Sequence, residues 1–370
     1  MTEPAPTGAT EVVFGGSGFI GTHLLGRLRA LGAAKIVSLD LRPPPRPVAG
    51  VDYRIGDVRD LSGLRLSGPV SRIFNLAAVH TTPGHAPWEY YDANVRGARE
   101  VARFAARQGC GQIVFTSSIS VYGPDEAAKD ESTAPAPVSD YGRSKRIAED
   151  LHRDWLEADP DRSLVILRPA VVFGLGEGGN FTRLARMLEK GIFVYPGRRD
   201  TIKSCIHVAD LLDWMLAAAD RPERSVLLNG AYANRYTIEE IVETFRRVAF
   251  PKARTVMLPA GVLKTAAAAL RPISATGLGI HPERIEKLMI STNILPLWAE
   301  AAGLPTRDRL EPALRAWRAA GGSCSARLNR RGSSLRSADR PPRPDRAALR
   351  GCRAARRHRG PGRRGAARSG

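Results

Sequence analysis

Short apolar runs alternate with longer amphipathic stretches through the first half of the chain. The runs have the length of buried strands, and the stretches between them carry apolar residues at helical spacing. Strands that alternate with helices in this way predict a doubly wound α/β fold, in which helices cover both faces of a parallel sheet. The predicted strands are 12–14, 35–40, 52–57, 72–78, 112–116 and 164–167, and the predicted helices begin at residue 22 and span 87–108 and 139–157.

Beyond about residue 170 the alternation becomes irregular. Loops and short helices in this half would form a lid over the carboxyl ends of the strands, where such sheets bind ligands. The predicted segments are a loop at 174–179, helices at 180–189, 206–219 and 237–248, a strand at 226–229, and mainly helical structure over 281–319.

The pattern divides the chain into a core at 1–170, a smaller, mainly helical substrate-binding lobe at 171–321, and a tail at 322–370. Some strands of the second lobe are expected to return to the core sheet. The tail contains 15 Arg, no Lys and two acids, which is +13 of the total net charge of +19. It has no aromatic residue, so we expect it to be disordered. Its abrupt change in composition is typical of an appended segment or of an out-of-frame reading of a GC-rich gene.

The basic charge therefore does not indicate a nucleic-acid partner for the folded part, which carries only 19 − 13 = +6. An arginine-rich arm that binds phosphate backbones is the alternative for the tail. The apolar fraction of 43% is that of a soluble globular protein, and no apolar run is long enough to cross a bilayer. The four cysteines lack metal-ligand spacing, so we expect a reduced, cytoplasmic protein without a metal site.

Gly15, Gly18 and Gly21 follow the first predicted strand directly, and a predicted helix comes next. Such spacing is typical of a dinucleotide-binding turn, where the helix N-terminus holds the phosphates. Asp40 ends the second predicted strand, 19 residues beyond Gly21. A carboxylate there accepts hydrogen bonds from ribose hydroxyls and repels a 2′-phosphate, so NAD is favoured over NADP. Arg42 leaves some room for NADP.

Tyr141 and Lys145 are four residues apart near the start of a predicted helix, which places both side chains on one face. An ammonium beside a phenol, with an oxidised nicotinamide nearby, would lower the phenol pKa from ~10 toward neutral pH. A phenolate of this kind is a general base for an alcohol or sugar hydroxyl. Ser118, at the end of the fifth predicted strand, would orient the same substrate oxygen.

The chain resembles the extended short-chain dehydrogenase/reductase family, most closely its nucleotide-sugar epimerase, dehydratase and reductase branch. The resemblance runs from about residue 11 to 317 and covers several independent motifs. They are GGSGFIG at 15–21, GD at 56–57, NLAA at 75–78, Ser118 with VYG at 121–123, YxxxK at 141–145, LRP at 167–169 and IHVxD at 206–210.

The resemblance implies a Rossmann-type core, a homodimer and a set of residue roles. Ser118, Tyr141 and Lys145 would be catalytic, and Ser118 and Tyr141 would also contact the substrate. Asn180 and Lys203 would bind the nucleotide sugar. His207 and Asp210 would be structural and brace the start of a helix. The residues expected to contact NAD are Gly15, Gly18, Phe19, Ile20, Gly21, Asp40, Asp57, Val58, Leu76, Ala77, Ala78, Asn94, Tyr141 and Lys145.

Departures from the family pattern narrow the chemistry. Family dehydratases carry an acid directly after the catalytic serine, whereas this chain has Ile119 and Ser120. The epimerase-reductases that invert C3 and C5 have a cysteine where Ser120 lies. Val171 replaces a frequent asparagine, and Lys203-Ser204 replaces a frequent Arg-Asp pair. Simple hydride chemistry remains, without elimination.

The sequence therefore predicts an NAD-dependent enzyme of the 4-epimerase type, which acts at a secondary alcohol of a nucleotide sugar through a 4-keto intermediate. The substrate would be a small molecule. A one-way ketoreductase or dehydrogenase, of a nucleotide sugar or of another alcohol such as a 3β-hydroxysteroid-like substrate, is the alternative. A non-catalytic NAD-binding protein fits less well, since binding alone does not need Ser118, Tyr141 and Lys145 together.

Overall fold

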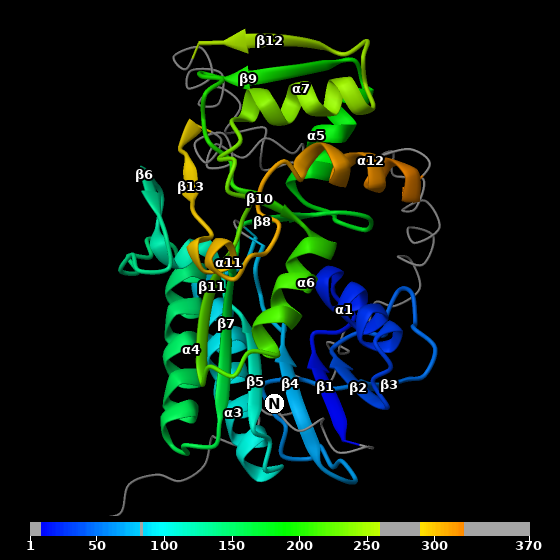
Figure 1. The fold of residues 1–370 in the computed structure, drawn as a ribbon, viewed down its shortest axis with the longest axis vertical. Helices are drawn as coiled ribbons and strands as arrows, with labels where there is room; N and C mark the ends of the chain where they lie inside the picture. The colour runs from blue at the N-terminus through cyan, green and yellow to red at the C-terminus, as the bar shows by residue number, and fades with distance from the viewer. Residues whose placement is uncertain (1–8, 82–83, 260–288, 322–370) are drawn as a thin grey trace, which may run out of the picture. The chain divides into compact units, whose positions relative to one another are not determined.

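A computed structural model describes residues 9–81, 84–259 and 289–321. Its central feature is a seven-stranded sheet in the order β11-β7-β5-β4-β1-β2-β3, in which every neighbouring pair is parallel (Figure 1). The predicted doubly wound fold is confirmed. The strands are β1 Thr10–Phe14, β2 Lys35–Asp40, β3 Val51–Ile55, β4 Val70–Asn75, β5 Gln112–Thr116, β7 Ser163–Pro169 and β11 Ser225–Gly230.

Side chains on both faces of this sheet are buried, which is why helices cover both. Along β1, Val13 belongs to one apolar core, and Val12 and Phe14 belong to the other. The Val13 face is covered by α1 (Phe19–Ala30) and α6 (Val208–Ala219). The opposite face is covered by α3 (Gly97–Arg107) and α4 (Asp140–Glu157) (Figure 1).

The helical stretch predicted over 87–108 consists of three elements. A short α2 (Pro87–Tyr90) leads into the π-helical segment η1 (Tyr91–Arg96), and α3 follows. Wide turns of this kind are frequent at functional sites, because they rotate a side chain inward. Here Asn94 is turned into the protein and is only 3% exposed.

Three two-stranded parallel sheets were missed by the sequence prediction. They pair β6 (Asp125–Lys129) with β13 (Thr292–Ile294), β8 (Val171–Phe173) with β10 (Cys205–His207), and β9 (Ile192–Pro196) with β12 (Arg254–Leu258). A helix from 206 was therefore wrong at its start, since β10 occupies 205–207 and α6 begins at Val208. These strands are short and their partners are distant in sequence, so local periodicity does not indicate them.

The remaining helices follow the sequence more closely. α5 and α7 fall where helices were predicted, whereas the described part of 281–319 contains β13 as well as helices. Residues 281–288 and the tail at 322–370 lie outside the described residues. Within the described ranges, no helix is long and apolar enough to span a membrane. The helices not yet given bounds are η2 Ile119–Tyr122, α5 Asn180–Glu189, α7 Ile238–Val248, α11 Leu297–Ala301 and α12 Leu310–Gly321.

Candidate active site

The glycine-rich turn connects β1 to α1 as the sequence predicted, and two of its glycines are required by space. Gly15 has φ +83°, and a Cβ on it would lie 2.7 Å from the backbone N of Ala77. A Cβ on Gly21 would lie 2.4 Å from the carbonyl oxygen of Gly15. The turn therefore packs tightly on the loop after β4 and on the first turn of α1.

This turn suits a dinucleotide diphosphate. Gly18 is the N-cap of α1, and the first turn of that helix contains no acidic residue, so its N–H groups and partial positive charge are available to an anion. A Cβ at Gly18 would meet only the carbonyl oxygen of Gly15, at 3.2 Å. Phe19 and Ile20 begin the helix here. The residues present fit the NAD phosphates predicted for this position.

Asp40 lies at the end of β2 and is tied to the turn. Its Oδ2 accepts a hydrogen bond from the backbone N–H of Ser17 at 3.0 Å, and its Oδ1 accepts one from the N–H of Arg42 at 3.3 Å. The carboxylate thus lies beside the glycine turn, where the ribose hydroxyls were predicted. Asp40 and the turn are brought together although 23 residues separate Ser17 from Asp40.

Five of the residues expected to contact NAD lie in the next two loops. β3 ends at Ile55 and β4 at Asn75, so Asp57, Val58 and the segment 76–78 lie in loops, where the sequence predicted strands for 56–57 and 76–78. The Asp57 carboxylate accepts hydrogen bonds from the Arg59 side chain, which hold its pKa below the ordinary value. Val58 contacts Gly97 at the start of α3, since a Cβ on that glycine would lie 2.9 Å from Val58 Cγ1.

Asn94 connects the loop after β4 to α4. Its Oδ1 accepts a hydrogen bond from the N–H of Val79 at 2.9 Å, and its Nδ2 donates to the carbonyl of Val79 at 3.0 Å and to Ser144 Oγ at 2.9 Å. All of these contacts are internal to the protein. The amide therefore holds the predicted cofactor groove against the helix that carries Tyr141 and Lys145.

Ser118, Tyr141 and Lys145 are brought together at the carboxyl end of β5. Ser118 is the N-cap of η2: its Oγ accepts a hydrogen bond from the N–H of Ser120 at 3.1 Å and donates to Ser120 Oγ at 3.2 Å, and the Ser118 side chain also acts to lower the pKa of Tyr141. Lys145 is 2% exposed, and its Nζ donates to the carbonyl of Thr116 at 2.8 Å and lies 4.8 Å from the centroid of the Phe115 ring. A Cβ on Gly142 would lie 2.4 Å from the carbonyl of Ser120, so α4 packs directly on η2, the short helix that follows Ser118.

The pKa of Tyr141 departs from the expectation. Desolvation raises it to about 12, and the hydrogen bond with Ser118 only partly opposes this rise. Burial also lowers the pKa of Lys145 to about 7, which Glu149 opposes. The lowered pKa predicted for Tyr141 in the presence of a bound nicotinamide stays a prediction, and in the chain without cofactor burial moves the pKa values of both groups toward their uncharged forms.

Sequence reasoning missed Glu149 as part of this site. Glu149 is fully buried on α4, four residues after Lys145, and forms an ion pair with Arg168 at 2.6 Å. The spacing was a usable signal, since an acid at i+4 from a lysine lies on the same helical face. The sequence marks Arg168 only as the centre of the LRP motif.

The predicted substrate residues lie on separate elements beyond residue 170. Asn180 begins α5 and accepts a hydrogen bond from Arg183 at 2.9 Å. Lys203 Nζ donates to the carbonyl of Ile290 at 2.5 Å, and burial lowers the pKa of Lys203 to about 8. Asn180 and Lys203 therefore come from different segments and have different internal partners.

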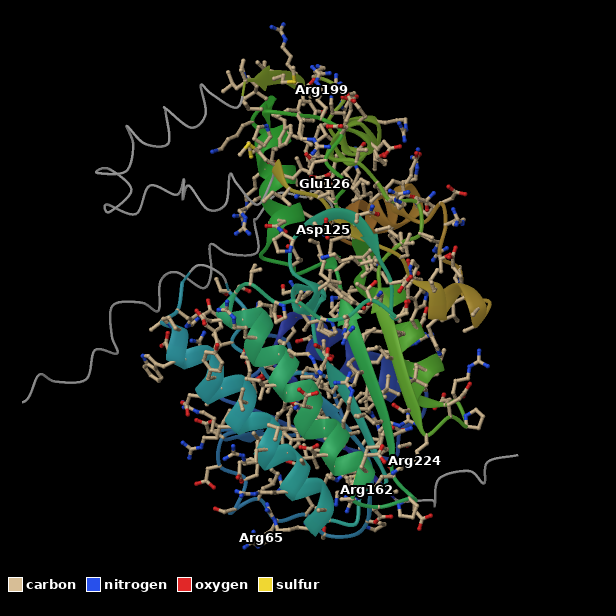
Figure 2. All side chains as sticks on the ribbon, turned by 90° about the vertical axis from the view of Figure 1, so that its left-hand side faces the viewer. Arg65, Asp125, Glu126, Arg162, Arg199 and Arg224 are labelled. Carbon is tan, nitrogen blue, oxygen red and sulfur yellow. The ribbon has the colours of Figure 1, made fainter. Side chains whose placement is uncertain are left out.

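Two further basic residues near Lys203 take part in ion pairs. Arg198 pairs with Asp200 at 2.6 Å and with Glu126 of β6 at 3.0 Å, and Arg199 pairs with Glu239 at 3.0 Å. Figure 2 labels Glu126 and Arg199 in this part of the protein, well away from Arg162 and Arg224. A substrate diphosphate would have to compete with these carboxylates for the guanidinium groups.

His207 and Asp210 brace α6, in the structural role expected of them. His207 Nδ1 accepts a hydrogen bond from the N–H of Ala209 at 3.3 Å and caps the helix. Asp210 accepts hydrogen bonds from Tyr232 at 2.5 Å and from Arg309 at 2.6 Å.

The sequence matches a known protein family and several known proteins. The sequence model of the NAD-dependent epimerase/dehydratase family matches residues 12–229. N-acetyl-α-D-glucosaminyl-diphospho-ditrans,octacis-undecaprenol 4-epimerase of Escherichia coli O157:H7 is 35% identical over 210 residues, which cover 55% of this chain and 61% of that protein. UDP-glucose 4-epimerase 4 of Oryza sativa subsp. japonica is 29% identical over 300 residues, 69% of this chain and 80% of the relative.

The fold also matches a solved structure. MoeE5 in complex with UDP-glucose and NAD matches with a TM-score of 0.64 and 26% sequence identity, over 85% of this chain and 100% of that chain. The match to the E. coli relative spans less than two thirds of that protein's length.

Proposed function

The chain belongs to the NAD-dependent epimerase/dehydratase family, and on this premise we propose that it is a nucleotide-sugar 4-epimerase. The observation that carries the proposal is the convergence of Ser118, Tyr141 and Lys145 at the end of β5. The relatives named 4-epimerases support the reaction class, and the lack of an acid at Ile119 and Ser120 speaks against elimination.

Bound at the glycine turn, NAD would supply a hydride acceptor and donor for the sugar carbon. The chain's own residues would handle the proton and the oxygen. Tyr141 removes the proton of the C4 hydroxyl, and Ser118 holds the same oxygen by a hydrogen bond. Lys145 in its ammonium form stabilises the phenolate, which offsets the desolvation that raises the pKa of Tyr141.

Gly15, Gly18 and Gly21 would hold the dinucleotide phosphates, and Asp40 would accept hydrogen bonds from its ribose. Asn180 and Lys203 would meet the nucleotide sugar from the second lobe. Lys203 reaches that role only if it exchanges its hydrogen bond with Ile290 for the substrate diphosphate. The contact of Lys203 with Ile290, together with Val171 and the missing Arg-Asp pair, supports as the second candidate a dehydrogenase or ketoreductase of another alcohol, which carries no diphosphate.

The test is an assay of the purified full-length chain with NAD and the UDP derivatives of glucose, N-acetylglucosamine and glucuronic acid. Since the E. coli relative is named for a polyprenyl-diphosphate-linked sugar, that substrate class is included. We expect the 4-epimer of at least one sugar, detected by chromatography, without net accumulation of reduced cofactor. Stoichiometric reduction of NAD instead would select the one-way dehydrogenase.

Tyr141→Phe is the matched variant. It removes the acidic hydroxyl and keeps the ring, so we expect kcat to fall by about 10²–10⁴-fold while NAD binding, followed by calorimetry, is retained. Tyr53→Phe is the control, because the Tyr53 hydroxyl accepts a hydrogen bond from the N–H of Val48, in the loop before β3. Wild-type kcat in Tyr141→Phe would refute the assignment of the base.

A further inference from the structure

Three residues on one face of α4 each contact a different residue at the end of β5. Tyr141 lies near enough to Ser118 for that side chain to act on its pKa, and Lys145 Nζ donates to the carbonyl of Thr116 at 2.8 Å. Glu149 makes the third contact, since its Oε1 accepts a hydrogen bond from Ser117 Oγ at 2.6 Å. These helix residues are spaced four apart, so they occupy successive turns.

Glu149 is held in place from a third element. Arg168 of β7 donates from Nε to Oε1 at 2.8 Å and from Nη2 to Oε2 at 2.6 Å, and both side chains are at most 2% exposed. Arg153 adds a hydrogen bond to Oε2 at 3.1 Å. A buried carboxylate bound at both oxygens by one guanidinium has little freedom to move.

Arg168 is fixed in turn by the interior of the protein. Its guanidinium lies 4.7 Å from the centroid of the Tyr122 ring, and the Tyr122 hydroxyl donates to Asn229 Oδ1 of β11 at 2.9 Å. The position of Glu149 therefore depends on three parallel strands and one helix, rather than on the local conformation of α4.

Glu149 is also the acidic group that acts on Lys145. Lys145 interacts electrostatically with Glu149 and His152 on α4 and with His80 in the loop after β4, and Arg168 of β7 lies behind Glu149. Tyr141 lies one turn before Lys145 on the same helix. Burial lowers the pKa of Lys145, and Glu149 raises it. In the chain without cofactor the Glu149 carboxylate therefore favours the ammonium form of Lys145, and the histidines, when protonated, oppose it.

We propose that Glu149 is a positioning residue for the reaction at Tyr141. Through Ser117 it fixes the end of β5, which leads into Ser118, and its negative charge favours the ammonium form of the Lys145 side chain. The inference deepens the proposed function and rests on it for the reaction itself. The Glu149–Arg168 pair would thus position Ser118 and Lys145 without itself contacting the substrate.

The first experiment is a pH titration of Lys145 in the full-length chain labelled with ¹³C at lysine Cε, without cofactor or substrate. The resonance is assigned by its loss in Lys145→Met. In Glu149→Gln we expect the midpoint to move to lower pH by about one unit, since a neighbouring negative charge is lost. The alkaline fall of kcat should move the same way, with KM nearly unchanged.

Asp150→Asn is the control on the same helix. Its carboxylate side chain is 48% exposed and pairs with Arg146 and Arg153, so removal of its charge should leave the Lys145 midpoint in place. An unchanged midpoint in Glu149→Gln would overturn the proposal. The titration needs no turnover, so it tests the charge of Lys145 even if no sugar in the assay is a substrate.

Ser117→Ala tests the positioning role if Glu149→Gln does not fold. It removes one hydrogen bond to Glu149 and leaves every charge in place. We expect kcat to fall by about 10-fold, with KM and the Lys145 midpoint as in the wild type, because small misplacements of catalytic groups are costly. A wild-type kcat in Ser117→Ala, with normal folding by circular dichroism, would refute the positioning role.

Discussion

At the scale of a single residue, Asp40 combines an observed contact within the protein with a predicted contact to the cofactor. Its carboxylate accepts hydrogen bonds from the N–H groups of Ser17 and Arg42, so it supports the glycine turn before any ligand arrives. The same group was predicted to accept hydrogen bonds from the ribose of NAD. Replacement by alanine would therefore confuse loss of the turn with loss of the ligand contact.

Asp40→Asn separates the two contacts. The amide oxygen still accepts a hydrogen bond from Ser17, while the negative charge that repels a 2′-phosphate is lost. We expect NAD affinity to fall by about 10-fold, the equivalent of about 1.4 kcal/mol, and NADP affinity to rise. Calorimetric titration of both cofactors measures the change.

Asp52→Asn is the control for this substitution, because Asp52 forms an exposed ion pair with Arg54 on β3. Both cofactor affinities should be unaffected there. If Asp40→Asn kept the full preference of the wild type for NAD over NADP, the assignment of Asp40 to the ribose would be wrong.

At the scale of the element, α1 combines a glycine that packing requires with one that it does not. Gly21 faces the turn, where a Cβ would lie 2.4 Å from the carbonyl oxygen of Gly15 and 2.6 Å from the Cα of Gly16. Gly26 lies on the same helix, and a Cβ there would meet nothing within 4 Å. The two positions separate tertiary packing from helix propensity.

We expect Gly21→Ala to lower the free energy of unfolding by about 1–3 kcal/mol, because the backbone of the turn must shift. Gly26→Ala should raise it by up to about 1 kcal/mol, because alanine favours a helix. Urea denaturation followed by circular dichroism measures both. Equal effects of the two substitutions would contradict the close packing of α1 on the turn.

At the scale of the whole molecule, a buried histidine links stability to pH. His152 is fully buried, stacks on Phe115 with 4.2 Å between ring centroids, and lies 3.3 Å from Asn75 Nδ2 through Nε2. Its Nδ1 is 2.7 Å from the carbonyl of Ala148, so the neutral ring donates at one nitrogen and accepts at the other. Burial lowers the pKa of His152 to about 4.

The sign of the pH effect follows from this lowered pKa. Between the folded value of about 4 and the ordinary value of 6.5, the unfolded chain binds more protons at this residue, so stability rises with pH. We expect the free energy of unfolding of the wild type to increase more steeply over this window than that of His152→Gln. Urea titrations at several pH values test the difference, and parallel profiles would contradict it.

The candidate site shows how far sequence reasoning reaches. The glycine turn and the pair Tyr141 and Lys145 were proposed because each is a short spacing in the sequence, and Asp40 was proposed because it ends the second predicted strand. Ser118 and Tyr141 were expected to contact one substrate oxygen, but the rise in the pKa of Tyr141 was not expected, because desolvation depends on everything packed around the hydroxyl. Glu149 was overlooked, since its partner Arg168 is 19 residues away.

The sequence by itself determined the parallel doubly wound sheet, the glycine turn between β1 and α1, and the helical spacing of Tyr141 and Lys145. Hydrophobic period and turn chemistry are local properties, so they can be read without the fold. Only the tertiary structure decided the pairing of β6 with β13, the burial of Lys145 and the Glu149–Arg168 ion pair. These depend on contacts between distant segments, and those contacts set the solvent exposure and the charges around each group.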